Sequence, residues 1–569
     1  MASLPWISYL QRMVGRGHPT LADTLNTPLR ELLTQSGYNP DASPFPGLMG
    51  PVANIRAFGA VGVGEASVSA DTAALQAAFA ASRYVYVPEG EFVISNAINY
   101  PDKATIFGGG AGSIIRNSVA RNPNSATMLQ PLANGYTNIT IRDLILDQLS
   151  QTLGESPSSQ CLSLQAITGC VVDNVTFRNI ITMAVWCDTP IVQGVTKAVR
   201  IRGCRVENSL GGGFSVFGNV SQWVVEGCVV ENCRDDAIAF QERNDGAAPS
   251  DINVNGNVIL NCDRRNAAGS TPRGILFQGV SRASAVGNII NKTVAGAIVA
   301  IPNTVGCSKI KIANNVVYQA GITVDSTSGV PGNGIQIQDG VDCSINDNEV
   351  HRSRESGVRV FGSPDRIKVN DNTCVANGFS GLELQNVRDF TVAGNVLTDN
   401  GAVASPQPFG IFLSSTTRDL KTGTISNNRI GQSALGVAGF TQTEGIRIGT
   451  ASGFVATDVT IDHNNMIGNT SAAIGGVAGV NIVKSRNRYS TGAMQGRAVL
   501  VNGTVTVSTA EVLAGDNISL TRVVGTSTTR GILTVGTIVA GTSFVIRAED
   551  LAGALSADDD STVFWEIVH

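Results

Sequence analysis

The sequence predicts an all-β protein: a long solenoid of stacked parallel strands, preceded by a short helical segment and followed by an antiparallel β-sandwich. Three observations support this fold class. Gly makes up 63 of the 569 residues, and only 15% of residues are charged. A short unit repeats through the middle of the chain, and its segments alternate apolar and polar residues. Such a chain favours short strands joined by tight turns over coiled coils, helix bundles and disordered charged tails.

The repeating unit has two parts and recurs from about residue 170 to 485. The first part is an Asn-containing segment such as GNVILNC, and the second is a short alternating strand such as GIQIQ. The second parts begin at intervals of 23 to 24 residues, with occasional longer ones, at Phe214, Ile238, Ile275, Ile298, Ile335, Val358, Leu382, Ile411 and Ile446. A fixed coil length with loops inserted at a corner gives this spacing, so the repeat predicts a solenoid in which alternate side chains point inward and outward.

One Asn recurs at the same place in the unit. Its side chain suits a turn, where it bonds the backbone or the Asn of the next coil. We therefore expect an Asn ladder along the solenoid, formed by Asn174, Asn257, Asn288, Asn315, Asn348, Asn372, Asn395, Asn428 and Asn465.

The segments that flank the repeats differ from them. Apolar spacing predicts a helix from Asp71 to Ser82, capped by Asp71 or Ser69, which is expected to cover the first coil. Residues 1–50 contain two helical stretches, about 3–15 and 20–36, and a Pro-rich linker; they are either a particle-attachment segment or an extension that covers the cap. The last 75 or so residues contain many short strand signals and predict the β-sandwich. The expected domains are thus residues 1–50, 51–490 and 491–569.

Composition also excludes several functions. The net charge is −5 without a basic block, which disfavours nucleic acid as a partner. No run of about 18 apolar residues and no secretion signal is visible, so we expect neither membrane insertion nor a classical export signal. The ten Cys lie in the middle of the chain and are interpreted as reduced, buried residues. No cofactor and no metal is expected, because paired CxxC spacing and calcium-site spacing are both missing.

Two stretches resemble known families. AFGAVGVG, ADTAALQAA and VYVPEGEFVIS resemble the opening of pectate-lyase-like right-handed parallel β-helix proteins, a resemblance that covers roughly residues 54–490. It departs from the family pattern at Val61–Gly64, where a Gly-Asp-Gly is usual. GTVTVSTAEVLAGDNISLTRVVG and STVFWEIVH resemble the small C-terminal module of bacteriophage tailspikes.

Together these resemblances imply a homotrimeric phage tailspike. Such a protein would be part of the virion and act at the host cell surface. It would bind a phage tail or baseplate protein through its N-terminus and a bacterial lipopolysaccharide or capsular polysaccharide through its solenoid, with avidity from three sites.

The outward residues of the second strand parts are the candidate polysaccharide groove. Amides, guanidinium groups and aromatic faces suit a sugar polymer. The candidates for substrate binding are Gln241, Glu242, Gln278, Gln336, Gln338, Asp339, His351, Arg359, Phe361, Gln385, Phe412 and Arg447. The alternative is a solvated solenoid face.

Hydrolysis of a glycosidic bond needs two carboxyl groups, one protonated and one ionised. Asp235 and Asp236, with Glu242, form a first acidic cluster and resemble the Asp-Asp of polygalacturonase-type β-helix hydrolases. The companion motifs of that family are missing: Gly212 stands where a carboxylate is expected, and no Gly-His-Gly occurs.

The second cluster comprises Asp339, Glu355 and Glu383 around Arg359. Its alternative interpretation is an Arg359–Glu383 ion pair between coils. The candidate catalytic residues are therefore Asp235, Asp236, Glu355 and Glu383.

Hydrolysis of a surface polysaccharide is the leading interpretation, and three others stay open. A polysaccharide lyase would use His351 and Arg359 to remove a proton next to a uronate. A spike of the same shape would only bind the sugar. A bacterial hydrolase or lyase unrelated to phage is the third.

Overall fold

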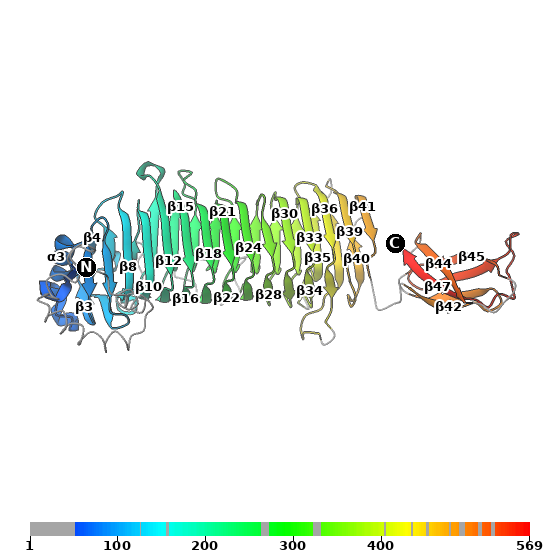
Figure 1. The fold of residues 1–569 in the computed structure, drawn as a ribbon, viewed down its shortest axis with the longest axis horizontal. Coiled ribbons are helices and arrows are strands. Elements are labelled where there is room, and N and C mark those ends of the chain that lie inside the picture. The colour runs from blue at the N-terminus through cyan, green and yellow to red at the C-terminus, as the bar shows by residue number, and fades with distance from the viewer. Residues whose placement is uncertain are drawn as a thin grey trace, which may run out of the picture.

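The computed structural model describes residues 52–568, apart from residues 126, 155–158, 263–271, 322–331, 403–404, 434–435, 451–453, 477–478, 489–494, 510–511, 513–514 and 525–529. The described chain is a long rod of stacked coils followed by a small antiparallel body (Figure 1). The helices and the attachment role expected for residues 1–50 lie outside the described residues.

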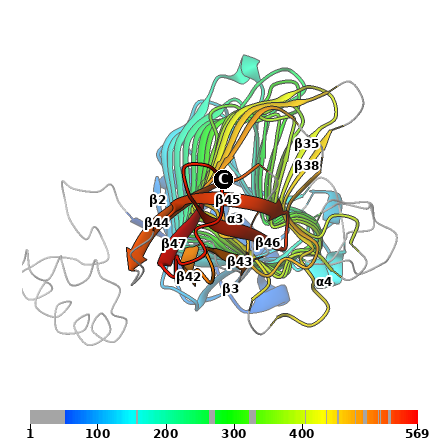
Figure 2. The same cartoon turned by 90° about the vertical axis from the view of Figure 1, so that its right-hand side faces the viewer.

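Each regular coil of the rod contributes three strands rather than the two that the repeat predicts. The first and second strands of the coils form one 27-stranded sheet, and the third strands form a 14-stranded sheet. The paired strands of both sheets are parallel, as in β17–β20 and β15–β18. Seen from the C-terminal side, successive coils lie behind one another (Figure 2). The strand that the repeat did not predict is the first one of each regular coil. It was missed because segments such as SDINVN carry few large apolar residues.

The 14-stranded sheet carries the candidate groove. Its strands are β4 (Ile98–Tyr100), β7 (Leu129–Pro131), β9 (Gln160–Ser163), β11 (Met183–Thr189), β14 (Gly212–Gly218), β17 (Ile238–Gln241), β20 (Ile275–Gln278), β23 (Ile298–Ile301), β26 (Ile335–Gln338), β29 (Val358–Phe361), β32 (Leu382–Gln385), β35 (Phe409–Ser415), β38 (Glu444–Thr450) and β40 (Ala472–Gly476).

The 27-stranded sheet forms the other walls of the rod. The first strands of its coils are β1 (Val52–Asn54), β2 (Tyr84–Val87), β5 (Thr105–Gly108), β12 (Thr196–Arg202), β15 (Val220–Glu226), β18 (Ser250–Asn255), β21 (Ser281–Val286), β24 (Ser308–Ala313), β27 (Ser344–Asn346), β30 (Asp365–Asn370), β33 (Arg388–Ala393), β36 (Leu420–Ser426), β39 (Ala456–Asp462) and β41 (Val480–Ser485). The second strands are β3 (Gly90–Ile94), β6 (Ser113–Asn117), β13 (Arg205–Ser209), β16 (Val229–Cys233), β19 (Val258–Cys262), β22 (Ile289–Thr293), β25 (Val316–Ala320), β28 (Glu349–His351), β31 (Thr373–Val375), β34 (Val396–Thr398) and β37 (Arg429–Gly431). Two long strands, β8 (Thr137–Asp147) and β10 (Thr168–Ile180), run through both positions and join them into one sheet.

The interior of the rod is a continuous apolar core. Inward residues of successive coils stack, as Phe240 does on Phe277 with ring centroids 6.4 Å apart. All ten Cys are buried and free. They line the interior as small apolar residues, because burial disfavours the thiolate that reactivity requires.

An Asn ladder runs along the turn between the first and second strands. The Nδ2 of each member donates to the Oδ1 of the next at 2.8–3.0 Å. The members are Asn257, Asn288, Asn315, Asn348, Asn372, Asn395, Asn428, Asn464 and Asn487.

Two positions of the expected ladder were wrong. The side chain of Asn174 bonds Asp143 on the surface instead, and Asn464 occupies the position assigned to Asn465. The residue before each ladder Asn has a left-handed φ, as at Gly256 (63°) and Asp371 (56°), which suits the Gly, Asn and Asp found at seven of the nine positions; His463 and Arg486 occupy the other two.

The N-terminal end of the rod is covered by helix α3 (Val68–Ala81), accompanied by the short 3-10 helices η1 (Ile55–Phe58) and η2 (Gly64–Ser67). Leu75 and Phe79 of α3 are buried in the apolar core, and the helix lies at the N-terminal end of the rod (Figure 1). Neither Asp71 nor Ser69 caps this helix as expected, because the helix begins at Val68 and its N-cap position is Ser67. Asp71 is fully buried, and its carboxylate accepts hydrogen bonds from the backbone N–H groups of Val61 and Val93, so it ties the helix to the first coils.

Further short helices lie in the connections of the early coils. They are η3 (Pro123–Ser125), α4 (Ser150–Leu153) and η4 (Ile191–Gln193). In the part of the chain that the structure describes, no helix is long and apolar enough to cross a membrane.

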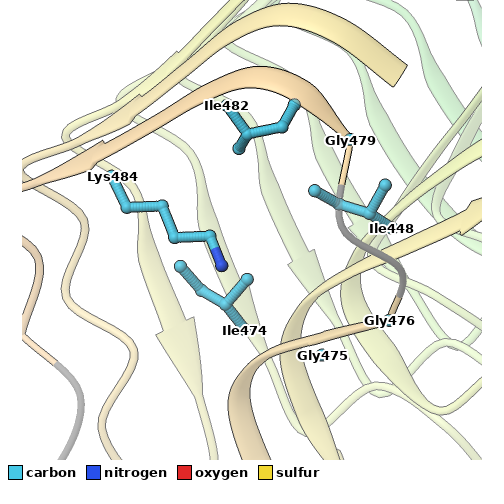
Figure 3. A pocket seen from close by; sticks show the side chains of 7 residues that line it. All are labelled: Ile448, Ile474, Gly475, Gly476, Gly479, Ile482 and Lys484. Atoms are coloured by element: carbon cyan, nitrogen blue, oxygen red, sulfur yellow. The ribbon is translucent and has the colours of Figure 1, made fainter. Parts of the chain in front are cut away.

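The C-terminal end of the rod differs from the capped N-terminal end. A cavity of about 290 Å³ opens at the last coil (Figure 3). Ile448, Ile474 and Ile482 line it, together with the aliphatic stem of Lys484. Core residues of the last coil therefore border an open space.

The C-terminal body is a β-sandwich, as expected. One sheet has the order β42 (Gln495–Val499), β47 (Thr562–Val568), β44 (Asn517–Val524), and the other has the order β43 (Thr504–Ser508), β46 (Ser543–Glu549), β45 (Ile532–Val539). Both sheets are antiparallel. Phe544 and Trp565, one from each sheet, pack edge to face at 5.2 Å in a core separate from that of the rod.

Candidate functional site

Two rows of outward side chains run along the 14-stranded sheet, in the register that the repeat predicts. Within each row, paired residues on successive strands are about 4.8 Å apart. The first outward row comprises Trp186, Ser215, Ala239, Leu276, Val299, Gln336, Arg359, Glu383, Phe412 and Arg447. The second outward row comprises Asp188, Phe217, Gln241, Gln278, Ile301, Gln338, Phe361, Gln385 and Ser414.

The first outward row is not a uniform groove. Ala239, Leu276 and Val299 are buried and form an apolar cluster outside the core of the rod. After Ser215, the next polar residue of this row is Gln336, on β26. The second outward row stays partly exposed from Asp188 to Gln385, and Gln241, Gln278 and Gln338 in it are all half-buried; only Ser414 at its end is buried.

Glu355, Arg359 and Glu383 come together on β29, β32 and the turn before β29. Arg359 pairs with Glu383 across the two strands, and its Nε lies 3.2 Å from Oε1 of Glu383. The hydroxyl of Ser356 donates to the other oxygen of Glu383 at 3.0 Å. The Arg359 guanidinium lies 4.5 Å from the centroid of the Phe361 ring. The predicted ion pair is thus present, but it is part of a larger cluster.

Both carboxyl groups of this cluster are harder to ionise than in water. Glu383 is only 4% exposed, and this burial raises its pKa against the opposing effects of Arg359 and Ser356. Burial also raises the pKa of Glu355. Arg359 and Arg354 oppose this rise, and the charge of Glu383 reinforces it. The Nε of Arg359 is buried, and its contact with Glu383 is an ion pair that lacks hydrogen-bond geometry.

Asp235 and Asp236 form a second pair, in the turn before β17. Asp236 is buried, and Arg273 donates to it from its backbone N–H at 2.9 Å and from its guanidinium at 3.3 Å. Burial and the neighbouring Asp235 raise the pKa of Asp236 to about 7, against the effect of Arg273. Burial also raises the pKa of Asp235.

Glu242 and Asp339 lie apart from the clusters to which the sequence assigned them. Each directly follows its strand, whereas Asp236 and Glu355 precede theirs, so they lie at opposite ends of the parallel strands. Glu242 is buried and accepts hydrogen bonds from the backbone N–H groups of Thr304 (3.0 Å) and Val305 (3.1 Å). Asp339 accepts from the backbone N–H of Ser363. Both side chains therefore hold loops in place.

The two residues proposed for lyase chemistry lie on different sheets. His351 is on β28 of the 27-stranded sheet, beside Glu349 at 3.8 Å, whereas Arg359 is on β29 of the other sheet. Farther along the first outward row, Arg447 pairs with Glu444 at 2.8 Å and lies over the Phe409 ring. Phe409 in turn packs on Phe412.

Sequence reasoning missed a hollow at the start of the second outward row. It measures about 380 Å³ and is lined by Trp186, Asp188, Phe217, Gln241, Glu242, Arg243, Asn244, Gln278 and Asn303. The signal was present: MAVWCDT alternates like the other strands, one coil before the first marker, Phe214. Extending the register back by that coil would have placed Trp186 and Asp188 outward.

Three family models match parts of the chain. Residues 52–264 match the pectate-lyase-like model of rhamnogalacturonase A and epimerase, and residues 273–492 match the right-handed β-helix region. Residues 492–568 match the C-terminal domain of K1 capsule-specific polysaccharide lyases. The rod is a right-handed parallel β-helix of the pectate-lyase-like type.

Solved structures share this fold. A double mutant of the tailspike protein of E. coli bacteriophage HK620 is 13% identical over 90% of this chain and 93% of that chain, with a TM-score of 0.56. A second mutant of that tailspike, in complex with a hexasaccharide, has the same identity and coverage and a TM-score of 0.54. At this identity the likeness concerns the fold. No curated protein sequence matches the chain.

Proposed function

We propose that this protein is a phage tailspike that binds and cleaves a bacterial surface polysaccharide, an O-antigen or a capsule, by hydrolysis of glycosidic bonds. One observation carries the proposal. Glu383 forms an ion pair with Arg359, and Glu355 lies close enough to feel the charges of both, on a surface that also presents amide and aromatic side chains. The fold shared with a tailspike that was solved with a hexasaccharide supports the choice of substrate class.

The electrostatics assign the two roles. Glu383 keeps its negative charge more readily, because Arg359 and the Ser356 hydroxyl stabilise the carboxylate. That charge in turn helps to keep Glu355 protonated. Glu355 then donates its proton to the glycosidic oxygen as the bond to the anomeric carbon breaks. Glu383 attacks that carbon or takes a proton from the attacking water, and the anomeric configuration of the product distinguishes these two routes.

Asp235 and Asp236 are the second candidate pair for the same reaction. The raised pKa of Asp236 suits a proton donor, but its carboxyl is enclosed and bonded by Arg273. We therefore assign cleavage to Glu355 and Glu383.

The test uses purified protein and a panel of capsular polysaccharides and lipopolysaccharides, with polymer size and ultraviolet absorbance as readouts. Glu383→Gln and Glu355→Gln should each lower kcat by about 10²- to 10⁴-fold while polymer binding persists. Asp236→Asn should keep most of the activity. Loss of activity only in the Asp236 variant would move the site to the other pair, and full activity of both Glu variants would refute the assignment.

Lyase chemistry is the second candidate function, because residues 492–568 match the C-terminal domain of a polysaccharide lyase. A lyase leaves an unsaturated uronate, so its products absorb ultraviolet light and hydrolase products do not. We expect shortening without new absorbance, and unchanged activity in His351→Ala. Binding without shortening would make the protein a passive receptor-binding spike.

We also propose that the spike is a homotrimer in the virion, divided into residues 1–50, 51–490 and 491–569. The sandwich supports association, because Val499, Val501 and Ile532 are more than half exposed on it. Light scattering should give about three times the chain mass of 59.2 kDa. Removal of residues 1–50 should abolish attachment to the tail and leave polysaccharide cleavage intact.

A further inference from the structure

We propose that the hollow at the start of the second outward row is a remote sugar-binding subsite that takes a neutral pyranose unit of the polysaccharide. This inference rests on the proposed function, because it assigns part of the same substrate. It adds a site that lies away from the acid cluster and makes no contact with the cleaved bond.

An aromatic pair lines part of the hollow. Trp186 on β11 and Phe217 on β14 are outward residues on adjacent coils, with ring centroids 4.8 Å apart and an interplanar angle of 44°. Both are only half-buried, and neither belongs to an apolar cluster of the described residues. Such a platform matches the apolar C–H face of a pyranose ring, since aromatic side chains offer large rigid surfaces.

The lining also carries free hydrogen-bonding groups. The side-chain amides of Gln241 and Gln278, on the next two coils, form no hydrogen bond with other described residues. Each amide offers both a donor and an acceptor, which suits sugar hydroxyl and acetamido groups. The lining of the hollow therefore combines an aromatic pair with unsatisfied polar groups.

The charges at the hollow favour a neutral sugar. Its lining contains the acids Asp188 and Glu242 and one cation, Arg243. The Arg243 guanidinium already forms ion pairs with Asp188 and, at 3.4 Å, with Asp245. A uronate or sialate carboxylate here would meet two acids without a free cation, a repulsion that discriminates against it.

The hollow and the acid cluster lie on one face but far apart. Six strand steps separate Phe217 on β14 from Glu383 on β32, which at about 4.8 Å per step is roughly 29 Å. The second outward row spans this interval, with Gln278, Gln338 and Phe361 along it. Only a polymer of several sugar units can contact both places, so the subsite contributes to the binding of long chains and not to bond cleavage.

Trp186 itself provides the first test. Trp223 and Trp565 are buried, so Trp186 is the half-exposed tryptophan of the described residues. Its fluorescence is obtained as the difference between the emission of the wild type and that of Trp186→Phe. Quenching of that fluorescence by acrylamide measures how exposed Trp186 is. Oligosaccharides of neutral hexoses and N-acetylhexosamines should protect it, and glucuronate and N-acetylneuraminate oligosaccharides should not. Equal protection by acidic sugars would refute the neutral preference, and protection by neither class would refute the subsite.

Kinetics provide the second test. Trp186→Ala and Phe217→Ala should each raise KM for the long polymer by about tenfold or more, with kcat and the cleavage of short oligosaccharides unchanged. Tyr318→Ala is the matched control, because Tyr318 is an exposed aromatic residue on the other sheet. An unchanged KM in both variants would overturn the subsite and leave the proposed function standing. Protection of Trp186 without any polymer cleavage would instead keep the subsite and refute the hydrolase.

Discussion

The Asn ladder is the feature whose energetic role the structure defines most fully, and Asn372→Ala tests it. The Asn372 side chain takes part in five buried or partly buried hydrogen bonds. Its Oδ1 accepts from the backbone N–H and the Nδ2 of Asn348, at 3.0 and 2.9 Å. Its Nδ2 donates to the carbonyl oxygens of Ile345 and Asn370 and to Oδ1 of Asn395.

The magnitude follows from what the substitution leaves behind. Each lost hydrogen bond costs about 0.5–1.5 kcal/mol of net stability. The backbone N–H of Asn348 would also remain buried without a partner, which costs about 1–3 kcal/mol more. Other groups of the ladder keep at least one bond each. We expect a loss of about 3–5 kcal/mol in the free energy of unfolding.

The assay is guanidinium-induced unfolding, with hydrogen exchange to locate the weakened coils. Asn346→Ala is the matched control, because Asn346 lies one coil away and its Oδ1 has no hydrogen-bond partner among the described residues. Exchange should rise mainly in the coils next to residue 372, since each coil of a solenoid contacts only its neighbours. If the two variants unfold within about 1 kcal/mol of each other, the ladder does not stabilise the stack as argued.

Two further predictions concern the core and the buried acid. A methyl group at Gly423 would meet the Phe390 ring of the preceding coil, whose nearest atom lies 2.0 Å from the added carbon, so Gly423→Ala should cost about 1–3 kcal/mol in a thermal melt. The exposed Thr424→Ala should cost little, and equal melting of the two variants would contradict this packing argument. The folded-state pKa of Asp236 is raised to about 7, so its contribution to stability is present below about pH 4 and is lost as pH rises through 7. Unfolding measured across this range should therefore show a decline of a few kcal/mol that is absent in Asp236→Asn; an identical pH profile in both proteins would mean that Asp236 is ionised throughout.

Much of the fold could be predicted because each coil repeats the same local chemistry. The inward residues Ile335 and Val358 mark equivalent positions, and their spacing fixed the register that places Arg359 beside Glu383. The first strand of the regular coils escaped prediction, because segments such as SDINVN carry few large apolar residues. The two adjacent Asn at 464 and 465 could not be told apart, since only the left-handed turn decides which one points into the stack.

The candidate site was harder to predict than the fold. Register relates one coil to the next, but a residue's position along its strand decides which side chains meet. Glu355 precedes its strand by three residues and Asp339 follows its strand directly, so the two acids lie at opposite ends of the sheet face. Burial and pKa values also depend on loops whose paths no repeat encodes. The aromatic hollow was missed for a simpler reason, because its coil lies before the first marker.

The Asn ladder also gives the rod an electrical direction. In every ladder amide, Oδ1 accepts from the preceding coil and one Nδ2 hydrogen donates to Oδ1 of the following coil, while Nδ2 also donates to a backbone carbonyl of the preceding coil. Aligned amide dipoles polarise one another, so each link strengthens its neighbours, and the partial charges remain uncancelled only at the two ends. At the N-terminal end, the Asn257 oxygen is satisfied by the backbone N–H of Cys228. The stack is therefore polar from end to end, and a coil inserted in reverse orientation would meet two like-charged ends.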